Sequence, residues 1–313
     1  MKITGTFLDE ISHDIPHQNW GAKDWDKDFA AMKAIGIDTV ILIRCGHKRF
    51  MTYPSEVLVK RENCYVPPVD LVDLYLTLAE KYDMKFFFGT YDSGKYWSNG
   101  KFDEEIDLNK AVCEEVWQRY GHRKAFKGWY LNQEVSRKVH GIIDLYASMG
   151  KFCKELSGNL PTMISPYIDG VKNVYAFDNV VAKTENVGLE RHEREWDEIL
   201  CGIQNSVNIV AFQDGHCEYS ELADFLRINK MLAKRYNMEC WTNCESFDRD
   251  MPIKFLPIKW EKMLLKLKAA KDAGLDKAIT FEFSHFMSPN SAYLQAGKLY
   301  ERYCEYFQID PKL

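Results

Sequence analysis

The sequence lacks an excess of positive charge and lacks any long apolar segment. It contains 41 lysines and arginines against 46 acids, for a net charge of -5, so no basic field is present to hold a nucleic acid backbone. The amino-terminal stretch MKITGTFLDEISHD has no apolar core of the kind found in signal peptides, and no later run is long enough to cross a bilayer. We therefore expect a cytoplasmic protein without nucleic acid or membrane partners.

Motifs for several kinds of chemistry are also missing. The nine cysteines are scattered, and the one close pair, Cys240 and Cys244, falls within a single expected strand rather than a zinc knuckle. This distribution is typical of reduced, buried thiols. The glycines of GTYDSGKYWSNG do not have the spacing of a phosphate-binding loop, and no serine nucleophile elbow is present. We expect no cofactor.

What the chain does contain is a regular alternation of β-rich and amphipathic helical runs. Its 313 residues are 46% apolar, which is enough for a large core, and no low-complexity linker divides them. The expected strands are Ile3–Leu8, Thr39–Arg44, Lys85–Tyr91, Phe126–Ser136, Pro161–Tyr167, Asn208–Gln213, Met238–Cys244 and Lys277–Phe283, with a further possible strand at Val180. This pattern predicts an α/β fold, a single (β/α)8 TIM barrel spanning residues 1–313.

The stretch FKGWYLNQEVS, from Phe126 to Ser136, is the most informative strand. Alternation places Tyr130, Asn132 and Glu134 on one face, because successive side chains of a strand point in opposite directions. The polar residues come at its carboxyl end. In a β/α barrel that end surrounds the active-site mouth, so Glu134 is a candidate catalytic residue.

Other expected strands end in polar residues as well, which suggests that several acids converge on one mouth. Two carboxyl groups that flank a cavity are what glycosidic bond cleavage requires, one protonated and one ionised. We expect two of the strand-end acids to form such a pair, with Glu134 as one candidate. The residues expected to bind substrate are Glu10, Arg44, Trp97, Asn132, Asp214, Asn243 and Glu282.

The positions of Glu134, Glu245 and Arg44 resemble the layout of the large clan of retaining glycosidases built on TIM barrels. The resemblance implies that Glu134 is the acid/base, that Glu245 is the nucleophile and that Arg44 steadies the nucleophile. More narrowly, GTFLDEISHDIPHQNWG and the following DFAAMKAIGIDTVILIR resemble a bacterial family of glycosidase-like barrels labelled as a domain of unknown function. This resemblance implies a carbohydrate substrate.

Some residues depart from the pattern of the clan, and two alternatives stay open. Gln133 separates Asn132 from Glu134, whereas the clan has asparagine directly before its acid/base, and Glu282 stands where tryptophan is frequent. One alternative is a divalent-metal sugar isomerase or epimerase, with ligands drawn from Glu134, Asp214, His216, Glu245 and Glu282. The other is a noncatalytic carbohydrate-binding barrel. The sugar, its linkage and the oligomeric state are left undetermined.

Overall fold

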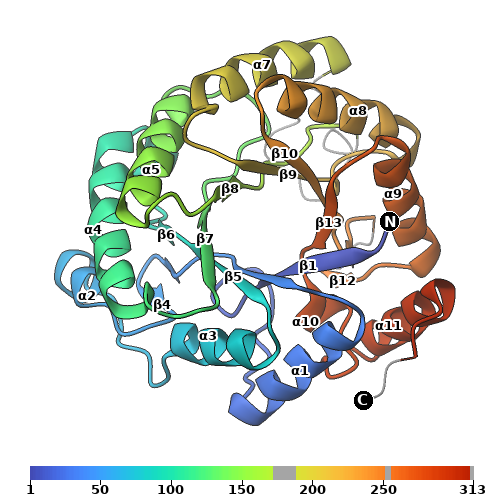
Figure 1. Ribbon diagram of the computed structural model, residues 1–313, viewed down its shortest axis with the longest axis horizontal. Coiled ribbons are helices and arrows are strands. Elements are labelled where there is room, and N and C mark those ends of the chain that lie inside the picture. Colours follow the sequence, from blue (N-terminus) through green and yellow to red (C-terminus); the bar gives the residue numbers. More distant parts are fainter. Residues whose placement is uncertain (172–187, 251–254, 311–313) are drawn as a thin grey trace.

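Eight parallel strands close into a barrel in the computed structural model, which describes residues 1–171, 188–250 and 255–310. The strands are β1 (Ile3–Leu8), β2 (Thr39–Leu42), β5 (Lys85–Gly89), β7 (Phe126–Leu131), β8 (Thr162–Ile164), β9 (Ile209–Gln213), β10 (Glu239–Asn243) and β13 (Lys277–Thr280). They follow one another around the barrel in chain order, and β13 pairs with β1 to close it. The predicted (β/α)8 barrel is confirmed (Figure 1).

Helices surround the barrel on its outside (Figure 1). They are α1 (Ala22–Ala34), α3 (Leu71–Lys81), α4 (Phe102–Tyr120), α5 (Ile142–Leu156), α7 (Leu189–Ile203), α8 (Tyr219–Arg235), α9 (Trp260–Asp272) and α11 (Leu294–Phe307). None of the helices in the described residues is both long and apolar enough to cross a membrane. The possible strand at Val180 lies outside the described residues.

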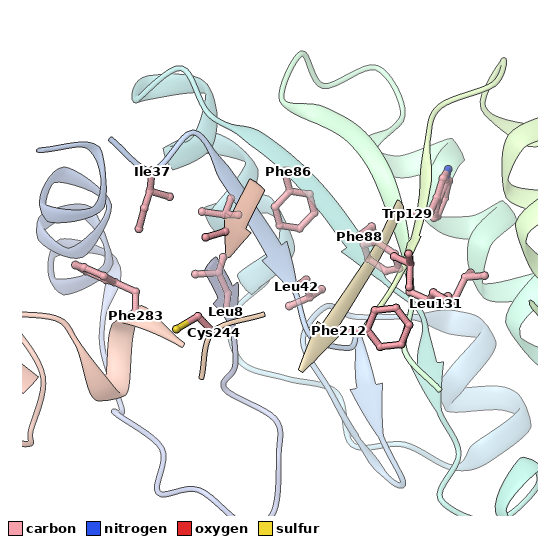
Figure 2. Packing of buried hydrophobic residues seen from close by; sticks show 14 of the residues in the cluster. Leu8, Ile37, Leu42, Phe86, Phe88, Trp129, Leu131, Phe212, Cys244 and Phe283 are labelled. Carbon is pink, nitrogen blue, oxygen red and sulfur yellow. The ribbon is translucent and has the colours of Figure 1, made fainter. Parts of the chain in front are cut away.

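The strand alternation divides the core into two layers. Phe87 points into the barrel, where it packs with Phe7, Tyr130 and Trp241 among others. Its neighbours Phe86 and Phe88 belong instead to the larger cluster between the strands and the helices, part of which Figure 2 shows. This outer cluster also contains eight of the nine cysteines, and all nine are free thiols. The side chains along the body of each strand are therefore buried in these two cores, and the residues at the strand ends are the ones that can contact a ligand.

Several short elements were not anticipated from the sequence. After β2 and β5 the chain forms a small sheet of β3 (Gly46–His47), β4 (Phe50–Met51) and β6 (Tyr91–Asp92), joined by α2 (Glu56–Glu62) and the 3-10 helix η1 (Trp97–Asn99). A hairpin of β11 (Phe247–Asp248) and β12 (Leu256–Pro257) follows β10. Two-residue strands are too short to show a hydrophobic period, which explains why they were missed.

Several predicted strands are too long. The strand predicted to reach Ser136 ends at Leu131, so Asn132 and Glu134 lie in the segment after β7. The last barrel strand is also shorter than predicted. It ends at Thr280 rather than Phe283, and the turn of helix α10 (Phe283–Phe286) begins directly afterwards. The Glu282 side chain caps this turn by accepting hydrogen bonds from the backbone N–H groups of Ser284 and His285. Capping fixes the Glu282 carboxylate at the start of the helix instead of at the end of a strand.

Candidate active site

A cavity of about 110 Å³ opens at the carboxyl end of the barrel and contains both predicted catalytic acids. One part of its lining is polar and carries Arg44, Glu134, Gln213, Glu245 and Arg249. Another part is apolar. The apolar side chains are Ile15, Ile43, Phe247, Phe255 and Phe281. The cavity therefore combines ionisable groups with an apolar wall, a common composition for a small-molecule site.

Glu134 enters the cavity from the segment that follows β7. Its Oε1 accepts a 2.9 Å hydrogen bond from the hydroxyl of Tyr130, a residue of the barrel interior. Burial raises the pKa of Glu134 above its usual value, and this effect outweighs the opposing influence of the Arg44 cation and of hydrogen bonds from Gln213 and Tyr130. The negative charge of Glu245 raises it further. Glu134 thus has the environment of a carboxylic acid that retains its proton.

Glu245 follows β10 and has the opposite character. Arg249 donates to both of its carboxylate oxygens, from Nε to Oε2 at 2.8 Å and from Nη2 to Oε1 at 2.7 Å. Burial alone would raise the pKa of Glu245, but the facing guanidinium overcomes that effect, with help from Lys266, and the net result is a lowered pKa. The environment of Glu245 therefore favours its ionised form, whereas the environment of Glu134 in the same cavity favours its protonated form.

The cavity also contains Arg44, which pairs with a different acid. Its Nη1 lies 3.3 Å from Oδ2 of Asp92 in β6. The Arg44 cation is one of the groups that hold the pKa of Asp92 at about 2 despite burial, together with His47. The resemblance to the retaining clan assigned Arg44 to the nucleophile, whereas here the arginine bonded to Glu245 is Arg249.

Comparison with protein families identifies the family to which the chain belongs. The model of a domain of unknown function, DUF4434, matches residues 3–293. The chain belongs to the DUF4434 family. A crystal structure from Bacteroides thetaiotaomicron VPI-5482, provisionally described as an alpha-L-fucosidase, shares 61% sequence identity over 99% of this chain and 94% of that one, with a TM-score of 0.94. No curated protein matches the chain.

More distant structures share the barrel. An endo-1,4-beta-D-mannanase from Thermotoga petrophila RKU-1 covers 90% of this chain over 88% of its own length, with a TM-score of 0.58 and 11% identity. The match with an intracellular xylanase from Thermoanaerobacterium saccharolyticum covers 90% of this chain and 85% of the xylanase, with a TM-score of 0.52 and 11% identity. At such identities the likeness extends to the fold alone.

Not every predicted site residue of this DUF4434 barrel lines the cavity. Asn132 is pinned to Thr90, whose backbone carbonyl accepts from Nδ2 at 3.0 Å and whose hydroxyl donates to Oδ1 at 2.9 Å. Asn243 donates to the hydroxyl of Ser165 at 3.2 Å. Trp97 lies in η1, and its indole N–H donates a 3.2 Å hydrogen bond to Asp92. Asp92 is also the ion-pair partner of Arg44. The lining residues do not include these three, and their contact with substrate stays a prediction.

The three predicted acids outside the cavity lining serve other groups. Asp214 forms a 2.7 Å ion pair with Lys266. Glu282 bonds to the Nδ1 atom of His285 at 2.5 Å in addition to capping α10. Burial raises the pKa of Glu10 to about 7, partly offset by the His285 cation, whose Nε2 lies 4.0 Å away. These contacts position backbone and neighbouring side chains, and the substrate-binding role of the three acids also stays a prediction.

The ligand set of the isomerase alternative is not assembled in the described part of the chain. Within residues 1–171, 188–250 and 255–310, no three histidine, cysteine or acidic side chains are grouped so that they could hold a metal ion. Of the ligands proposed, Asp214 is paired with Lys266 and Glu282 with His285. The metal-dependent isomerase alternative therefore lacks a set of ligands arranged around one metal position in the described residues.

Arg249 and Lys266 contact Glu245 in the structure but were not among the residues predicted from the sequence. Lys266 carried a visible signal, because it falls on the same helical face as Met263, Leu267 and Ala270, which are all buried in α9. A lysine on an apolar helix face indicates a buried charge that needs a partner. Arg249 carried only its spacing of four residues from Glu245, in a segment with no predicted structure.

Proposed function

We propose that this DUF4434 barrel is a glycoside hydrolase that acts by a retaining, two-carboxylate mechanism. Glu134 is the acid/base in this proposal, and Glu245 is the nucleophile. The observation that supports these roles is the opposite displacement of two pKa values in one cavity, raised for Glu134 and lowered for Glu245. Separated pKa values are what divides two carboxyl groups into an acid and a nucleophile.

The reaction would proceed in two displacements. An ionised oxygen of Glu245 attacks the anomeric carbon while the proton of Glu134 passes to the departing glycosidic oxygen, which leaves a glycosyl ester and an ionised Glu134. Water then attacks the anomeric carbon and gives a proton to Glu134, while the bond between that carbon and the Glu245 oxygen breaks and releases the Glu245 carboxylate. The sugar leaves with its original anomeric configuration, and both carboxyl groups return to their starting states.

The substrate class to test first is the α-L-fucosides. One support is the relative at 61% identity that is provisionally described as an alpha-L-fucosidase. The other is the apolar part of the cavity lining, formed by Ile15, Phe247, Phe255 and Phe281. A 6-deoxy sugar carries a methyl group where most hexoses carry a hydroxymethyl, and burying that methyl against apolar side chains is favourable.

The test is a panel of 4-nitrophenyl glycosides, with α-L-fucoside included, assayed with the wild-type protein and with Glu134→Gln and Glu245→Gln. We expect each substitution to reduce kcat by at least about 10³-fold, because each removes a group required in the transition state. Glu301→Gln is the matched control, since its side chain is 56% exposed and pairs with the exposed Lys298. Nuclear magnetic resonance of the first product formed reports its anomeric configuration.

Two results would overturn the proposal. Unchanged turnover in Glu245→Gln excludes that residue as nucleophile, and a product of inverted configuration excludes the double displacement. If oligosaccharides bind to the wild-type protein without any product after long incubation, the noncatalytic barrel replaces the enzyme. Arg249 occupies both oxygens of Glu245, which is the observation that favours this second candidate.

A further inference from the structure

The pairing of Glu245 with Arg249 is a built feature of the site rather than a surface ion pair. The Glu245 side chain is 2% exposed, and two hydrogen bonds of 2.7 and 2.8 Å fix the plane of its carboxylate. Arg249 follows β11 directly, and its guanidinium lies over the ring of Phe247, 4.8 Å from the ring centroid. Bidentate bonding and cation–π contact together restrict the guanidinium to one orientation.

Gly215 leaves room for this pair. A Cβ atom placed on Gly215 would lie 1.7 Å from Oε2 of Glu245 and 2.3 Å from Nε of Arg249. The backbone of Gly215 is not in the positive-φ region, so its conformation is open to other residues. Space for the Glu245–Arg249 pair, rather than backbone freedom, is therefore what demands glycine at this position.

We propose that Arg249 is the positioning residue of the nucleophile Glu245. The absence of a side chain at Gly215 leaves the space that this pairing needs. Arg249 then steadies the nucleophile, which is the role that the resemblance to the retaining clan implied for Arg44. This inference rests on the proposed glycoside hydrolase function. Arg249 faces Glu134 as well as Glu245. Its cation therefore interacts electrostatically with both carboxyl groups whose charges exchange during the reaction.

The position of Arg249 gives it a part in both displacements. Before the reaction its cation stabilises ionised Glu245 and aligns an oxygen for attack. Once Glu245 becomes a glycosyl ester, it no longer carries a negative charge. Glu134 is then the one carboxylate of the pair that can interact with the Arg249 cation. The cation then favours ionised Glu134, which is the form that must accept a proton from the attacking water.

Other charged groups also face Glu245 and must be held constant. They lie on α9, on the segment after β9 and on the segment after β7. They are Lys266, His216, Asp214 and Glu134. The titratable thiol of Cys244, which directly follows β10, also faces Glu245. Tyr167 faces Arg249 from the segment after β8. Substituting Arg249 leaves all of them in place, so the difference between variant and wild type reports on Arg249.

The first experiment compares pH profiles of kcat/KM for wild type, Arg249→Gln and Arg249→Lys with an activated aryl glycoside. We expect Arg249→Gln to lose about 10²-fold in kcat, as for a misplaced reacting group, and to move the acid limb up by about one pH unit or more. Arg249→Lys should recover part of the shift, because it restores the charge without the bidentate geometry. Arg302→Gln, a surface variant whose partner Glu305 is 64% exposed, should behave as wild type.

The second experiment disturbs the pair without changing any charge. Gly215→Ala should displace Glu245 and Arg249 from each other and move the acid limb in the same direction as Arg249→Gln. Gly188→Ala is the matched control, because a Cβ there meets nothing within 4 Å and its φ of -60° suits alanine. Equal profiles for the two alanine variants would refute the role assigned to Gly215.

A third measurement keeps the inference independent of activity. Carbon-13 titration of glutamate carboxyl groups, with Glu245→Gln used for assignment, follows the ionisation of Glu245 in the unliganded protein. A higher midpoint in Arg249→Gln and a smaller rise in Arg249→Lys support the inference even if no glycoside is cleaved, in which case only the proposed function fails. If the enzyme is active but neither the midpoint nor the acid limb moves in a folded Arg249 variant, the inference is wrong.

Discussion

The Nζ atom of Lys266 lies 2.7 Å from Oδ1 of Asp214, and their side chains are 4% and 1% exposed. The same Nζ donates a 2.8 Å hydrogen bond to the backbone carbonyl of Glu245, and the same Oδ1 accepts a 3.1 Å hydrogen bond from the backbone N–H of Glu245. The ion pair thus holds both polar groups of the Glu245 main chain. Because both side chains are buried, the two charges compensate each other in the protein interior, and water does not screen them as it screens an exposed ion pair.

We expect Lys266→Met to destabilise the protein by about 3–5 kcal/mol, because it leaves the buried Asp214 carboxylate without its cationic partner. Urea denaturation gives the free energy of unfolding. Lys298→Met is the control, since its ion pair with Glu301 is exposed and contributes about 1 kcal/mol or less. A loss in Lys266→Met no larger than that of the control would mean that the buried pair has little structural weight.

The pH dependence of kcat/KM should be bell-shaped. Activity requires ionised Glu245, whose pKa is lowered, so the acid limb should lie below the ordinary glutamate value of 4.5. It also requires protonated Glu134, whose pKa is raised, so the alkaline limb should lie above 4.5. Glu134→Gln, assayed with an activated leaving group, should abolish the alkaline limb and keep the acid limb. A wild-type profile without an alkaline limb contradicts the assignment of Glu134.

Stability should decrease with rising pH through the titration of His285. Burial alone would lower its pKa, but the facing Glu282 carboxylate raises it from 6.5 to about 9. Because the folded-state value is the higher one, the contribution is complete below pH 6.5 and is lost as the pH rises through about 9. The shift corresponds to on the order of 3 kcal/mol.

Urea denaturation of wild type and His285→Gln at pH 6 and pH 10 isolates this contribution. The difference between the two free energies of unfolding should be smaller in His285→Gln by roughly 3 kcal/mol. His122→Gln, which alters an exposed histidine, should keep the wild-type difference. Identical pH dependence in wild type and His285→Gln would show that the Glu282–His285 pair does not stabilise the fold.

Gly128→Ala should destabilise the barrel interior. A Cβ at Gly128 would meet the ring of Phe87 at 2.3 Å, and that ring has little freedom because it also packs edge-on against Trp241. We expect a loss of about 1–3 kcal/mol from this overpacking. In the double variant Gly128→Ala with Phe87→Leu, the loss should be smaller than the sum of the two single losses. Strict additivity would show that the Gly128 and Phe87 positions do not interact.

The order of strands and helices was predictable from the sequence because it depends on local periodicity. Phe86, Phe87 and Phe88 alternate between the two cores as a strand requires, and the buried residues of α9 recur at helical spacing. Eight such units leave the closed barrel as the arrangement that buries every apolar face. The short sheet of β3, β4 and β6 has no such pattern and could be found only in three dimensions.

For the site, the sequence placed Glu134 at the carboxyl end of one barrel strand and Glu245 directly after another, since strand ends are visible as polar residues after apolar runs. Only the tertiary structure decided their electrostatic character. Burial separates a carboxyl group from water, and a bonded cation compensates its charge, but neither depends on neighbours in sequence. Glu282 illustrates the limit, because its position in the sequence did not indicate that its carboxylate caps α10 and faces His285. The identity of a charge partner is set by folding, through contacts that periodicity does not encode.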